Sequence, residues 1–289
     1  MDMFKEAGKP RLSAIMPLRG PLVDFNFLKE LLVQSENKGI QVIVVHDIND
    51  VATSSILREL FIEFKLSMHQ LFEARLNSPG LARNVGLLNS SADWVCFWDS
   101  DDQPIPEQFL RMIQFGVERK SEIVIGEFSN LESGAEKKIK SKELRMREIS
   151  IVLNPGIWRM IFRRELLEPT RFIRSLMGED QAFLVDIQLF KRKIDWYPHV
   201  TYKYRVGEVN QLTSNSKNVR ELESTIRHLV VDSKVFSSGS DKYGILVTYK
   251  MLATGILRGS LGLRIKFTSL AIVGIPILIC RLMSRGLNK

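Results

Sequence analysis

The sequence is poor in the residues that build disulfide frameworks and most transition-metal sites. Its 289 residues include two cysteines and four histidines. Cys96 and Cys280 lie far apart, and Cys96 falls within an apolar run. No disulfide framework or zinc-ligand spacing is therefore present, which fits a reducing compartment. The N-terminal stretch MDMFKEAGKPR lacks the apolar region of a signal peptide, so none is predicted.

Acidic residues are missing from the C-terminal part of the chain. None follows Asp241, whereas eight of the 41 Lys and Arg residues do. The other 33 bases equal the 33 acids, so the net charge of +8 belongs wholly to this tail. A neutral body with a basic apolar tail suits an anionic membrane surface better than a nucleic acid, and we expect no nucleic-acid partner.

An apolar run long enough to cross a membrane is also missing. The run Phe267–Cys280 has about 14 residues, whereas a spanning helix needs roughly 20. Residues 216–289 are predicted to form a helical, basic region that attaches to the cytoplasmic face of the cell membrane without crossing it. The alternative is that the run forms a buried C-terminal helix.

The first half of the chain alternates short apolar runs with helical patterns. This alternation of strand-like and helical segments predicts an α/β fold with a mostly parallel sheet that is covered by helices on both faces. The expected strands are 11–17, 41–47, 69–75, 92–99 and 121–128, and the expected helices are 24–34, 51–64, 79–91 and 106–119. The charged stretch Asn130–Glu148 interrupts this alternation and is expected to be a hairpin or loop insertion. Residues 217–236 are expected to be helical.

Acidic residues stand where two of the expected strands end. VIVVHD ends in Asp47, and VCFWDSDD ends in Asp99, Asp101 and Asp102. In an open α/β sheet, ligands bind at the carboxyl ends of the strands. Mg²⁺ commonly uses one or two carboxylates together with substrate phosphates, so the cluster indicates a cation and a phosphorylated ligand. An Asx-turn leading into a proline-started helix explains the same residues without a ligand.

A second acidic pair, Glu179 and Asp180, follows a glycine and precedes the apolar stretch QAFLVDIQLF. Acids at a helix N-terminus are favoured by the helix dipole, which explains the pair without a catalytic role. Arg83, just before the strand that ends in Asp99, and the segment Thr201–Thr213, with its aromatic residues and bases, are candidates for phosphate contact.

The order of these segments resembles the family 2 glycosyltransferases, which have the GT-A fold. The resemblance spans about Leu12 to Thr213. SPGLARNVGLLNSSADWVCFWDSDD resembles the G-x-ARN-x-G…D-x-DD segment of that family most closely. AIMPLRGP, VIVVHDINDVAT, NPGIWRMIFRRELL, GEDQAFL and YKYRVGEVNQLT resemble its opening strand, nucleotide-binding segment, acceptor-side segment, ED motif and closing segment. His46 and Arg19-Gly20 depart from the usual residues.

The resemblance implies a role for each matched residue. Asp180 would be the general base that deprotonates the acceptor hydroxyl, with Glu179 in support. Asp101 would face a divalent cation, Mn²⁺ or Mg²⁺, with Asp99 at the ribose or in the metal shell. The nucleotide-sugar donor would be contacted by Asp47, Arg83, Asp99, Pro17 and Arg205.

The sequence thus predicts a GT-A domain over residues 1–215, with a nucleotide-binding half at about 11–128 and an acceptor half at about 150–215. The expected activity is metal-dependent, inverting transfer from a nucleotide-diphosphate sugar, with UDP favoured, to a glycan or lipid-linked acceptor in cell-surface polysaccharide synthesis. The alternatives are a degenerate GT-A binding or scaffold subunit and a nucleotidyltransferase. PLRGP is a poor match for the Gly-rich phosphate loop of the nucleotidyltransferase class.

Overall fold

The chain divides into two compact units. The computed structural model describes residues 9–20, 24–48, 51–63, 67–132, 135–138, 147–153, 155–206, 216–232, 242–269 and 271–272. The first unit comprises Met1–Ser141, Gly156–Pro169 and Lys193–Gly207, and the second comprises Lys142–Pro155, Thr170–Arg192 and Glu208–Lys289. The domain boundaries expected from the sequence, 1–215 and 216–289, stay a prediction.

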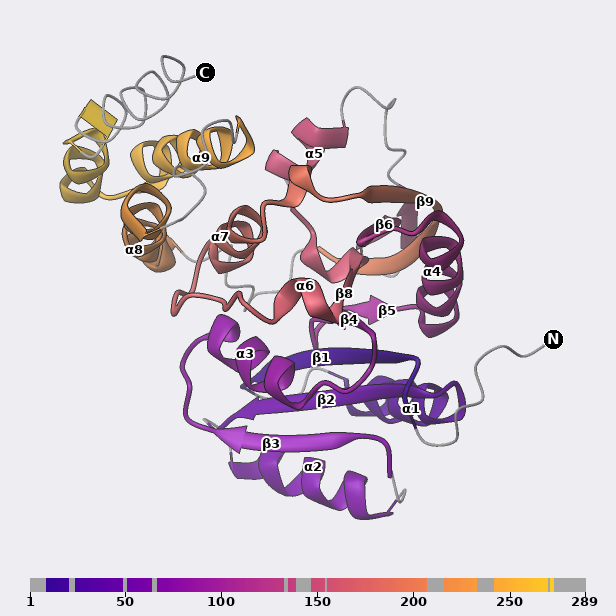
Figure 1. The fold of residues 1–289 in the computed structure, drawn as a ribbon. Coiled ribbons are helices and arrows are strands. Elements are labelled where there is room, and N and C mark those ends of the chain that lie inside the picture. Colours follow the sequence, from indigo (N-terminus) through magenta and orange to yellow (C-terminus); the bar gives the residue numbers. More distant parts are fainter. Residues whose placement is uncertain are drawn as a thin grey trace. The chain divides into compact units, whose positions relative to one another are not determined.

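The first unit is built on one mixed sheet (Figure 1). Among the described residues, nine strands pair in the order β3-β2-β1-β4-β8-β6-β9-β5, with β7 beside β6. Six strands run in one direction, and β5, β7 and β8 run against them. The strands are β1 (Leu12–Arg19), β2 (Ile40–Asp47), β3 (Gln70–Ala74), β4 (Trp94–Phe97), β5 (Gln103–Pro104), β6 (Ile123–Glu132), β7 (Ala135–Lys138), β8 (Met160–Arg163) and β9 (Ile194–Arg205). The mostly parallel sheet expected from the sequence is confirmed.

Helices of the first unit begin where the sequence carries capping residues. The Asp24 carboxylate accepts a 3.0 Å hydrogen bond from the Phe27 amide, and the Ser78 hydroxyl accepts one of 3.4 Å from the Leu81 amide. Each bond satisfies a backbone donor that the first helical turn leaves unpaired. The helices of this unit are α1 (Phe25–Asn37), α2 (Val51–Glu63), α3 (Pro79–Asn89), α4 (Pro106–Arg119), α6 (Arg164–Leu167) and the 3₁₀ turn η2 (Ile157–Arg159).

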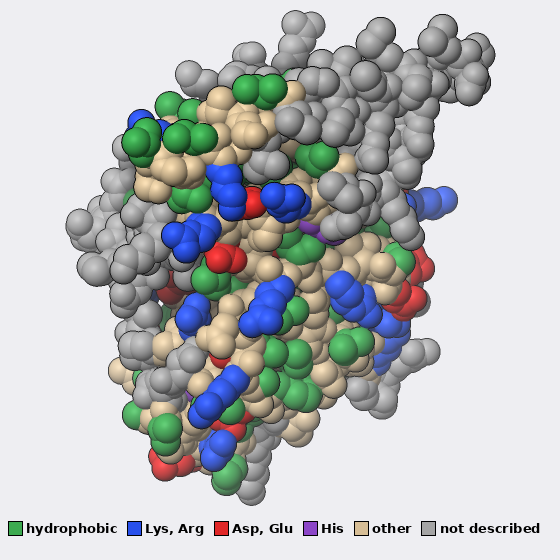
Figure 2. Space-filling model, turned by 90° about the vertical axis from the view of Figure 1, so that its left-hand side faces the viewer, with side chains coloured by type: hydrophobic (Ala, Val, Ile, Leu, Met, Phe, Trp, Pro, Cys, Tyr) green, Lys and Arg blue, Asp and Glu red, His purple; other side chains and the backbone are tan. Residues whose placement is uncertain are grey.

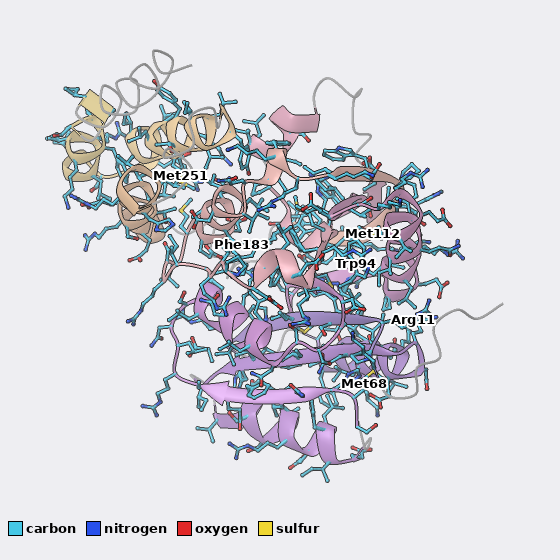
Figure 3. The ribbon with its side chains drawn as sticks, in the orientation of Figure 1. Arg11, Met68, Trp94, Met112, Phe183 and Met251 are labelled. Atoms are coloured by element: carbon cyan, nitrogen blue, oxygen red, sulfur yellow. The ribbon has the colours of Figure 1, made fainter. Side chains whose placement is uncertain are left out.

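Successive side chains of the central strands point to opposite faces of the sheet, and both faces are buried. On one face, a continuous apolar core joins the strands to helices of the unit, with Trp94 and Met112 among its members (Figure 3). On the other face, α3 lies against β1 and β2. A Cβ on Gly86 would stand 2.3 Å from the Ile15 Cγ2 atom. Glycine at this position is therefore what lets α3 approach the sheet so closely.

The charged insertion expected over Asn130–Glu148 begins as a hairpin. Strands β6 and β7 pair antiparallel, with Glu132 opposite Ala135. Residues 133–134 and 139–146 lie outside the described part of the chain.

The second unit contains helices and short helical turns in its described residues. They are α5 (Arg147–Leu153), α7 (Glu179–Asp186), η3 (Leu189–Lys191), η5 (Ser216–Glu221), α8 (Leu222–Arg227), the π-helical turn η6 (His228–Asp232) and α9 (Lys242–Arg258), and residues 261–269 and 271–272 are helical as well. The helix expected over 217–236 is confirmed as helical structure as far as Asp232, and residues 233–236 are not described.

The apolar run Phe267–Cys280 is described only as far as Ile272, without Leu270. Its first residue, Phe267, is 1% exposed, and a Cβ on Gly255 of α9 would stand 2.5 Å from its ring. Phe267 is therefore part of the packing of this unit, not of an exposed anchor. In the described portion, every helix falls short of the length and apolarity needed to cross a membrane.

Candidate active site

Polar side chains gather at the carboxyl edge of the first unit's sheet. Strand β2 ends in Asp47, Asp99 follows the end of β4, and β9 ends in Arg205. These three strands run in the same direction, so their carboxyl ends share one edge, where ligands of open α/β sheets bind. Pro17 lies on β1 opposite Val45 of β2, two residues before the end of its strand.

Asp47 fixes the loop that leads from β3 into α3. One carboxylate oxygen accepts a 2.9 Å hydrogen bond from the Leu76 amide, and the other accepts one of 2.8 Å from the Asn77 amide. The residue is 3% exposed, and Asn77 has a positive φ of 50°. Asp47 therefore has a clear structural role in this edge, and its contact with a nucleobase stays a prediction.

Arg83 and Asp99 form an ion pair at the same edge. The Arg83 Nη2 atom lies 2.9 Å from the Asp99 Oδ1 atom, with the Arg side chain 7% and the Asp side chain 27% exposed. The Asp99 amide also donates to the Tyr202 hydroxyl at 2.9 Å. The side chain of Asp99 is thus bound by Arg83 and its backbone amide by Tyr202. The guanidinium of Arg83 offsets one of the two negative charges of the D-x-D pair, Asp99 and Asp101.

Asp102, the third acid of the triplet, differs from its neighbours. It is 2% exposed, and its Oδ1 atom accepts a 2.7 Å hydrogen bond from the Arg205 amide. Burial, together with the negative charges of Asp99 and Asp101, raises the pKa of Asp102 to about 9. Asp102 therefore holds a proton at neutral pH and joins the turn after β4 to the end of β9.

The side chain of Arg205 extends toward the start of α1, where its Nη2 atom lies 3.5 Å from Asp24 Oδ2. Tyr202 and Asp102, which bind Asp99 and Arg205, contribute to this edge, and neither received an individual role from the family resemblance. The Y-x-YR pattern in YKYR was the available signal for Tyr202.

His46, which departs from the usual family residue, lies in a polar network. Its Nδ1 atom lies 3.2 Å from the Ser54 hydroxyl and 3.7 Å from Glu73 Oε1, and the second Glu73 oxygen binds Arg58 at 2.6 Å. His46 itself is fully buried. The substitution is thus accommodated beneath the sheet edge by partners from α2 and β3. Asp50, in the same motif, lies outside the described residues.

The chemistry of this edge suits a hard divalent cation. Burial is the main cause of the raised pKa of Asp102, and repulsion from Asp99 and Asp101 adds to it; a cation beside Asp101 would relieve that repulsion. Arg83 offsets the charge of Asp99, and a bound cation would offset charge at Asp101. Within the described ranges, no group of three or more His, Cys, Asp or Glu side chains is placed to bind a metal ion by itself. Mg²⁺ sites completed by substrate phosphates use one or two carboxylates, so Asp101 and Asp99 fit such a site.

Glu179 and Asp180 open helix α7 in the second unit. Gly178 caps the helix with a positive φ of 84°, which glycine adopts without strain. Glu179 is 7% exposed, whereas Asp180 is only partly buried and its Oδ1 atom accepts a 2.7 Å hydrogen bond from the Gln181 amide. The first turn of a helix stabilises carboxylates in their ionised form. Asp180 is therefore an acid in the first turn of a helix with access to solvent, as a general base requires.

The structure thus brings Arg83 to Asp99, and the backbone of Arg205 to Asp102, within the first unit. Glu179 and Asp180 belong to the second unit. The roles given to all of these residues in donor binding, metal binding and catalysis stay predictions.

A family model described as glycosyl transferase family 2 matches residues 26–195, more than half of the chain. The chain belongs to glycosyl transferase family 2. The resemblance seen in the sequence is confirmed, and so is the expected enzyme class, a glycosyltransferase.

Curated relatives of the chain are bacterial glycosyltransferases. "Glycosyltransferase GlyA" of Streptococcus pneumoniae is 24% identical over 207 residues, 63% of this chain and 29% of that protein. "GalNAc(5)-diNAcBac-PP-undecaprenol beta-1,3-glucosyltransferase" of Campylobacter jejuni is 25% identical over 223 residues, 72% of this chain and 69% of that protein. The chain spans less than a third of the length of the first relative.

Solved structures share the fold. Staphylococcus aureus TarS 1–349 matches with a TM-score of 0.65 and 19% identity over 95% of this chain and 82% of that one. Its complex with UDP-GlcNAc matches with a TM-score of 0.62 and 16% identity, over 96% of this chain and 92% of that one. The mannosyltransferase PcManGT of Pyrobaculum calidifontis, in complex with GDP-Man and Mn²⁺, matches with a TM-score of 0.56 and 14% identity, over 98% and 89%. The expected GT-A-type α/β fold is confirmed.

Proposed function

We propose that the protein transfers a sugar from a nucleoside-diphosphate sugar, with UDP as the favoured nucleotide, to the hydroxyl of a glycan or lipid-linked acceptor. The observation that carries this proposal is the Arg83–Asp99 pair beside Asp101 at the carboxyl edge of a family 2 sheet. TarS in complex with UDP-GlcNAc supports the choice of nucleotide, and the undecaprenol-linked acceptor named for the Campylobacter relative supports the acceptor class.

On the donor side, Asp101 and Asp99 would hold a divalent cation, Mn²⁺ or Mg²⁺. The complex of PcManGT with GDP-Man and Mn²⁺ supports this choice. When bound, such a cation supplies positive charge that stabilises a nucleoside diphosphate as the leaving group. Arg83 adds a fixed cation at the same edge, and Asp47 and Arg205 border it, with Pro17 on the neighbouring strand.

On the acceptor side, Asp180 takes the proton from the attacking hydroxyl, and Glu179 supports it. The new bond forms at the anomeric carbon as the bond to the diphosphate breaks, with inversion in a single displacement. General-base catalysis contributes about 10²–10⁴-fold to a rate. Asp180 is suited to this role because it lies in the first turn of α7, where the helix dipole favours a carboxylate, and is not closed off from solvent.

The acceptor class implies work at a membrane surface, and we place the protein at its cytoplasmic face. Large apolar side chains of the C-terminal region are exposed, namely Leu246, Tyr249, Leu257, Leu261, Ile265 and Ile272. Bases lie among them in the sequence. Figure 2 shows apolar and basic side chains interspersed on the face that it draws. Such a combination suits an anionic lipid surface.

The experiment that tests the proposal is a binding screen followed by turnover. Thermal unfolding is recorded with UDP, GDP, CDP and ADP, each with Mn²⁺ and with excess chelator. Binding at 100 times Kd stabilises the native state by about 2.7 kcal/mol, or roughly 4 °C for a chain of this size. Stabilisation by UDP that requires Mn²⁺, and release of UDP from a UDP-sugar when an acceptor is added, support the proposal. Failure of every diphosphate to stabilise the protein contradicts it.

A further inference from the structure

Arg159 is a buried arginine at the carboxyl edge of the first unit's sheet. It ends the turn η2, immediately before β8, and η2 lies against β4, β6 and β9. In the ladder between β4 and β8, Cys96 pairs with Ile161, so two further steps along the strands bring Arg159 to the level of Trp98. Because β4 and β8 are antiparallel, β8 starts beside the end of β4, where Asp99 follows.

A series of ring contacts connects Arg159 with the D-x-D turn. Its guanidinium carbon lies 4.9 Å from the centre of the Phe128 ring, and this ring meets Trp158 edge-on at 5.0 Å. Trp158 stacks on Tyr202 at 4.5 Å, and the Tyr202 hydroxyl accepts the hydrogen bond from the Asp99 amide. Arg159 therefore packs in the same aromatic cluster that supports Asp99.

The guanidinium of Arg159 is a positive charge that water hardly reaches. The residue is 4% exposed, and its Nε atom is buried without a hydrogen-bond partner among the described residues. Burial lowers the pKa of Arg159 to about 10, an effect that the negative charge of Glu127 opposes, so the residue stays charged at neutral pH. The face of the Phe128 ring and the charge of Glu127 stabilise this cation, but the Nε hydrogen still lacks an acceptor.

Such a group is unfavourable for folding, because a buried charge is tolerated well only when its hydrogen bonds are made. A neutral side chain of similar length would fill the same space without this cost. At the carboxyl edge of an open sheet, however, a poorly hydrated cation is useful, because a low effective dielectric strengthens its attraction for a nearby anion. The location of Arg159 thus favours a role toward a ligand.

We propose that Arg159 supplies a fixed positive charge that attracts an anionic group of the donor, either its diphosphate or a carboxylate on the sugar that it carries. The two groups share the chemistry that Arg159 recognises, an oxygen with negative charge. This inference rests on the proposed function in taking a nucleoside-diphosphate sugar as the donor. It adds a second buried arginine to the edge at which Arg83 binds Asp99.

Arg163 provides a matched control at the other end of β8. Its guanidinium carbon lies 4.3 Å from the centre of the ring of Trp94, which is labelled in Figure 3, so it too is a cation over an aromatic face. Four steps along an extended strand separate the two arginines by roughly 13 Å. Arg163 therefore lies toward the opposite edge of the sheet, away from Asp99, and its replacement removes the same charge and the same kind of contact.

The first measurement is binding by isothermal titration calorimetry with Mn²⁺ present, using uridine, UDP, UDP-glucose and UDP-glucuronate. If Arg159 attracts the diphosphate, Arg159→Met should weaken UDP binding about tenfold, the scale of one charge–charge interaction at an effective dielectric of about 20. Uridine, which has no phosphate, should bind as it does to the wild type. If Arg159 attracts a sugar carboxylate, only UDP-glucuronate should lose about tenfold. Arg159→Lys should restore most of the affinity, and Arg163→Met should bind every ligand as the wild type does.

The second measurement is urea denaturation without nucleotide. Arg159→Met should be at least as stable as the wild type, because an apolar side chain of similar length replaces a buried charge with an unmade hydrogen bond. A purely structural role of Arg159 would give the opposite result, a less stable variant whose folded form binds every ligand as the wild type does.

Equal affinities of the wild type and folded Arg159→Met for all four ligands overturn the inference, as does an equal loss in Arg163→Met. Inorganic pyrophosphate distinguishes this failure from failure of the proposed function. A wild type that binds pyrophosphate more tightly than Arg159→Met does, but binds no nucleoside diphosphate, upholds the anion site and contradicts the proposed function. A wild type that binds neither pyrophosphate nor any nucleoside diphosphate contradicts both.

Discussion

The guanidinium of Arg83 on α3 lies 2.9 Å from the carboxylate of Asp99, sixteen residues later and beyond the end of β4. Because the Arg side chain is buried and the Asp side chain only partly so, losing the cation leaves an acid whose hydration is incomplete. The pair therefore stabilises this edge as well as shaping it.

Arg83→Ala should lower the free energy of unfolding by about 1–3 kcal/mol, less than for a fully buried pair because Asp99 reaches solvent. Arg83→Lys should lose less. Lys9→Ala removes a pair of similar length, 2.7 Å, between side chains that are 45% and 62% exposed, and should cost under about 1 kcal/mol. Urea denaturation measures all three. Equal losses for Arg83→Ala and Lys9→Ala would show that burial adds nothing here.

The neighbouring acids Asp101 and Asp102 should respond oppositely to the same substitution. Asp101→Asn removes the charge that a cation needs, so transfer at saturating Mn²⁺ should collapse while the fold survives. Asp102→Asn replaces an already protonated acid with a neutral side chain of the same shape, and should retain both the fold and most of the activity. Full activity of Asp101→Asn, or of the wild type in excess chelator, would contradict the metal mechanism.

The raised pKa of Asp102 also predicts how stability depends on pH. The native state keeps a proton on this residue up to a pKa of about 9, whereas the unfolded chain releases it near 3.8. Since the native state binds the extra proton, this contribution is full below the unfolded pKa and is lost as pH rises through the native one. Relative to the wild type, Asp102→Asn should therefore become progressively more stable between pH 5 and about pH 9. Urea titrations of both proteins in a pH series measure the difference, and a constant difference would show that Asp102 is ionised in the native state.

Much of the first unit could be predicted because the signals for its helices and strands lie in consecutive residues of the sequence. Helix α4 begins at Pro106 and ends at Arg119, as its apolar spacing and its proline indicate. Strands β2 and β4 stand out as apolar runs that end in acids. Strand β8 did not, because its three apolar residues have an arginine on either side, and neither did β9, whose twelve residues lack a regular alternation of buried and exposed positions.

The electrostatic state of the site depends on contacts between distant residues. The protonation of Asp102 follows first from its burial, and the Arg205 amide that binds its carboxyl group, although this bond favours the ionised form, lies 103 positions away. In the sequence, Asp102 is one of three equivalent acids. Residue type and spacing therefore identified the acids, but not which of them bears a proton.

Gly86 should tolerate no side chain, because helix α3 carries Arg83 and lies against the sheet through this glycine. The Cβ of Gly86→Ala would stand 2.3 Å from Ile15, forcing the helix outward at a cost of about 1–3 kcal/mol, only partly offset by the higher helix propensity of Ala. Gly262 is also helical and has open space where a Cβ would lie. Gly262→Ala should therefore be neutral or stabilising by up to about 1 kcal/mol. Thermal unfolding of the two variants gives the comparison, and opposite signs are expected.

Asp180→Asn should leave nucleotide binding nearly unchanged, since the general base faces the acceptor, and should reduce transfer by at least about a hundredfold. Glu179→Gln should lose much less. Binding is measured by the thermal shift with UDP and Mn²⁺, and transfer by UDP release in the presence of acceptor. Parallel loss of binding and transfer in Asp180→Asn would mean that the residue is structural.

Attachment to an anionic membrane should depend on the exposed apolar side chains of the C-terminal region. Leu257, Leu261 and Ile265 are 74%, 76% and 65% exposed. Partial burial of each in lipid is worth about 1 kcal/mol, so replacing all three with Ser should weaken vesicle binding roughly a hundredfold. The matched control replaces Val51, Ile62 and Leu88 of the first unit, which are 76%, 77% and 70% exposed, and should bind as the wild type does.

Co-sedimentation with vesicles that contain phosphatidylglycerol measures this binding. High salt should weaken it without abolishing it, because bases contribute alongside the apolar contacts. A truncation that tests the remaining apolar run should begin after Ile272, since Phe267 is packed against Gly255 and its removal would disturb the unit. A truncated protein that stays folded but no longer pellets would locate part of the attachment in residues 273–289. Equal pelleting of the wild type, the triple Ser variant and the truncated protein would contradict attachment through this region.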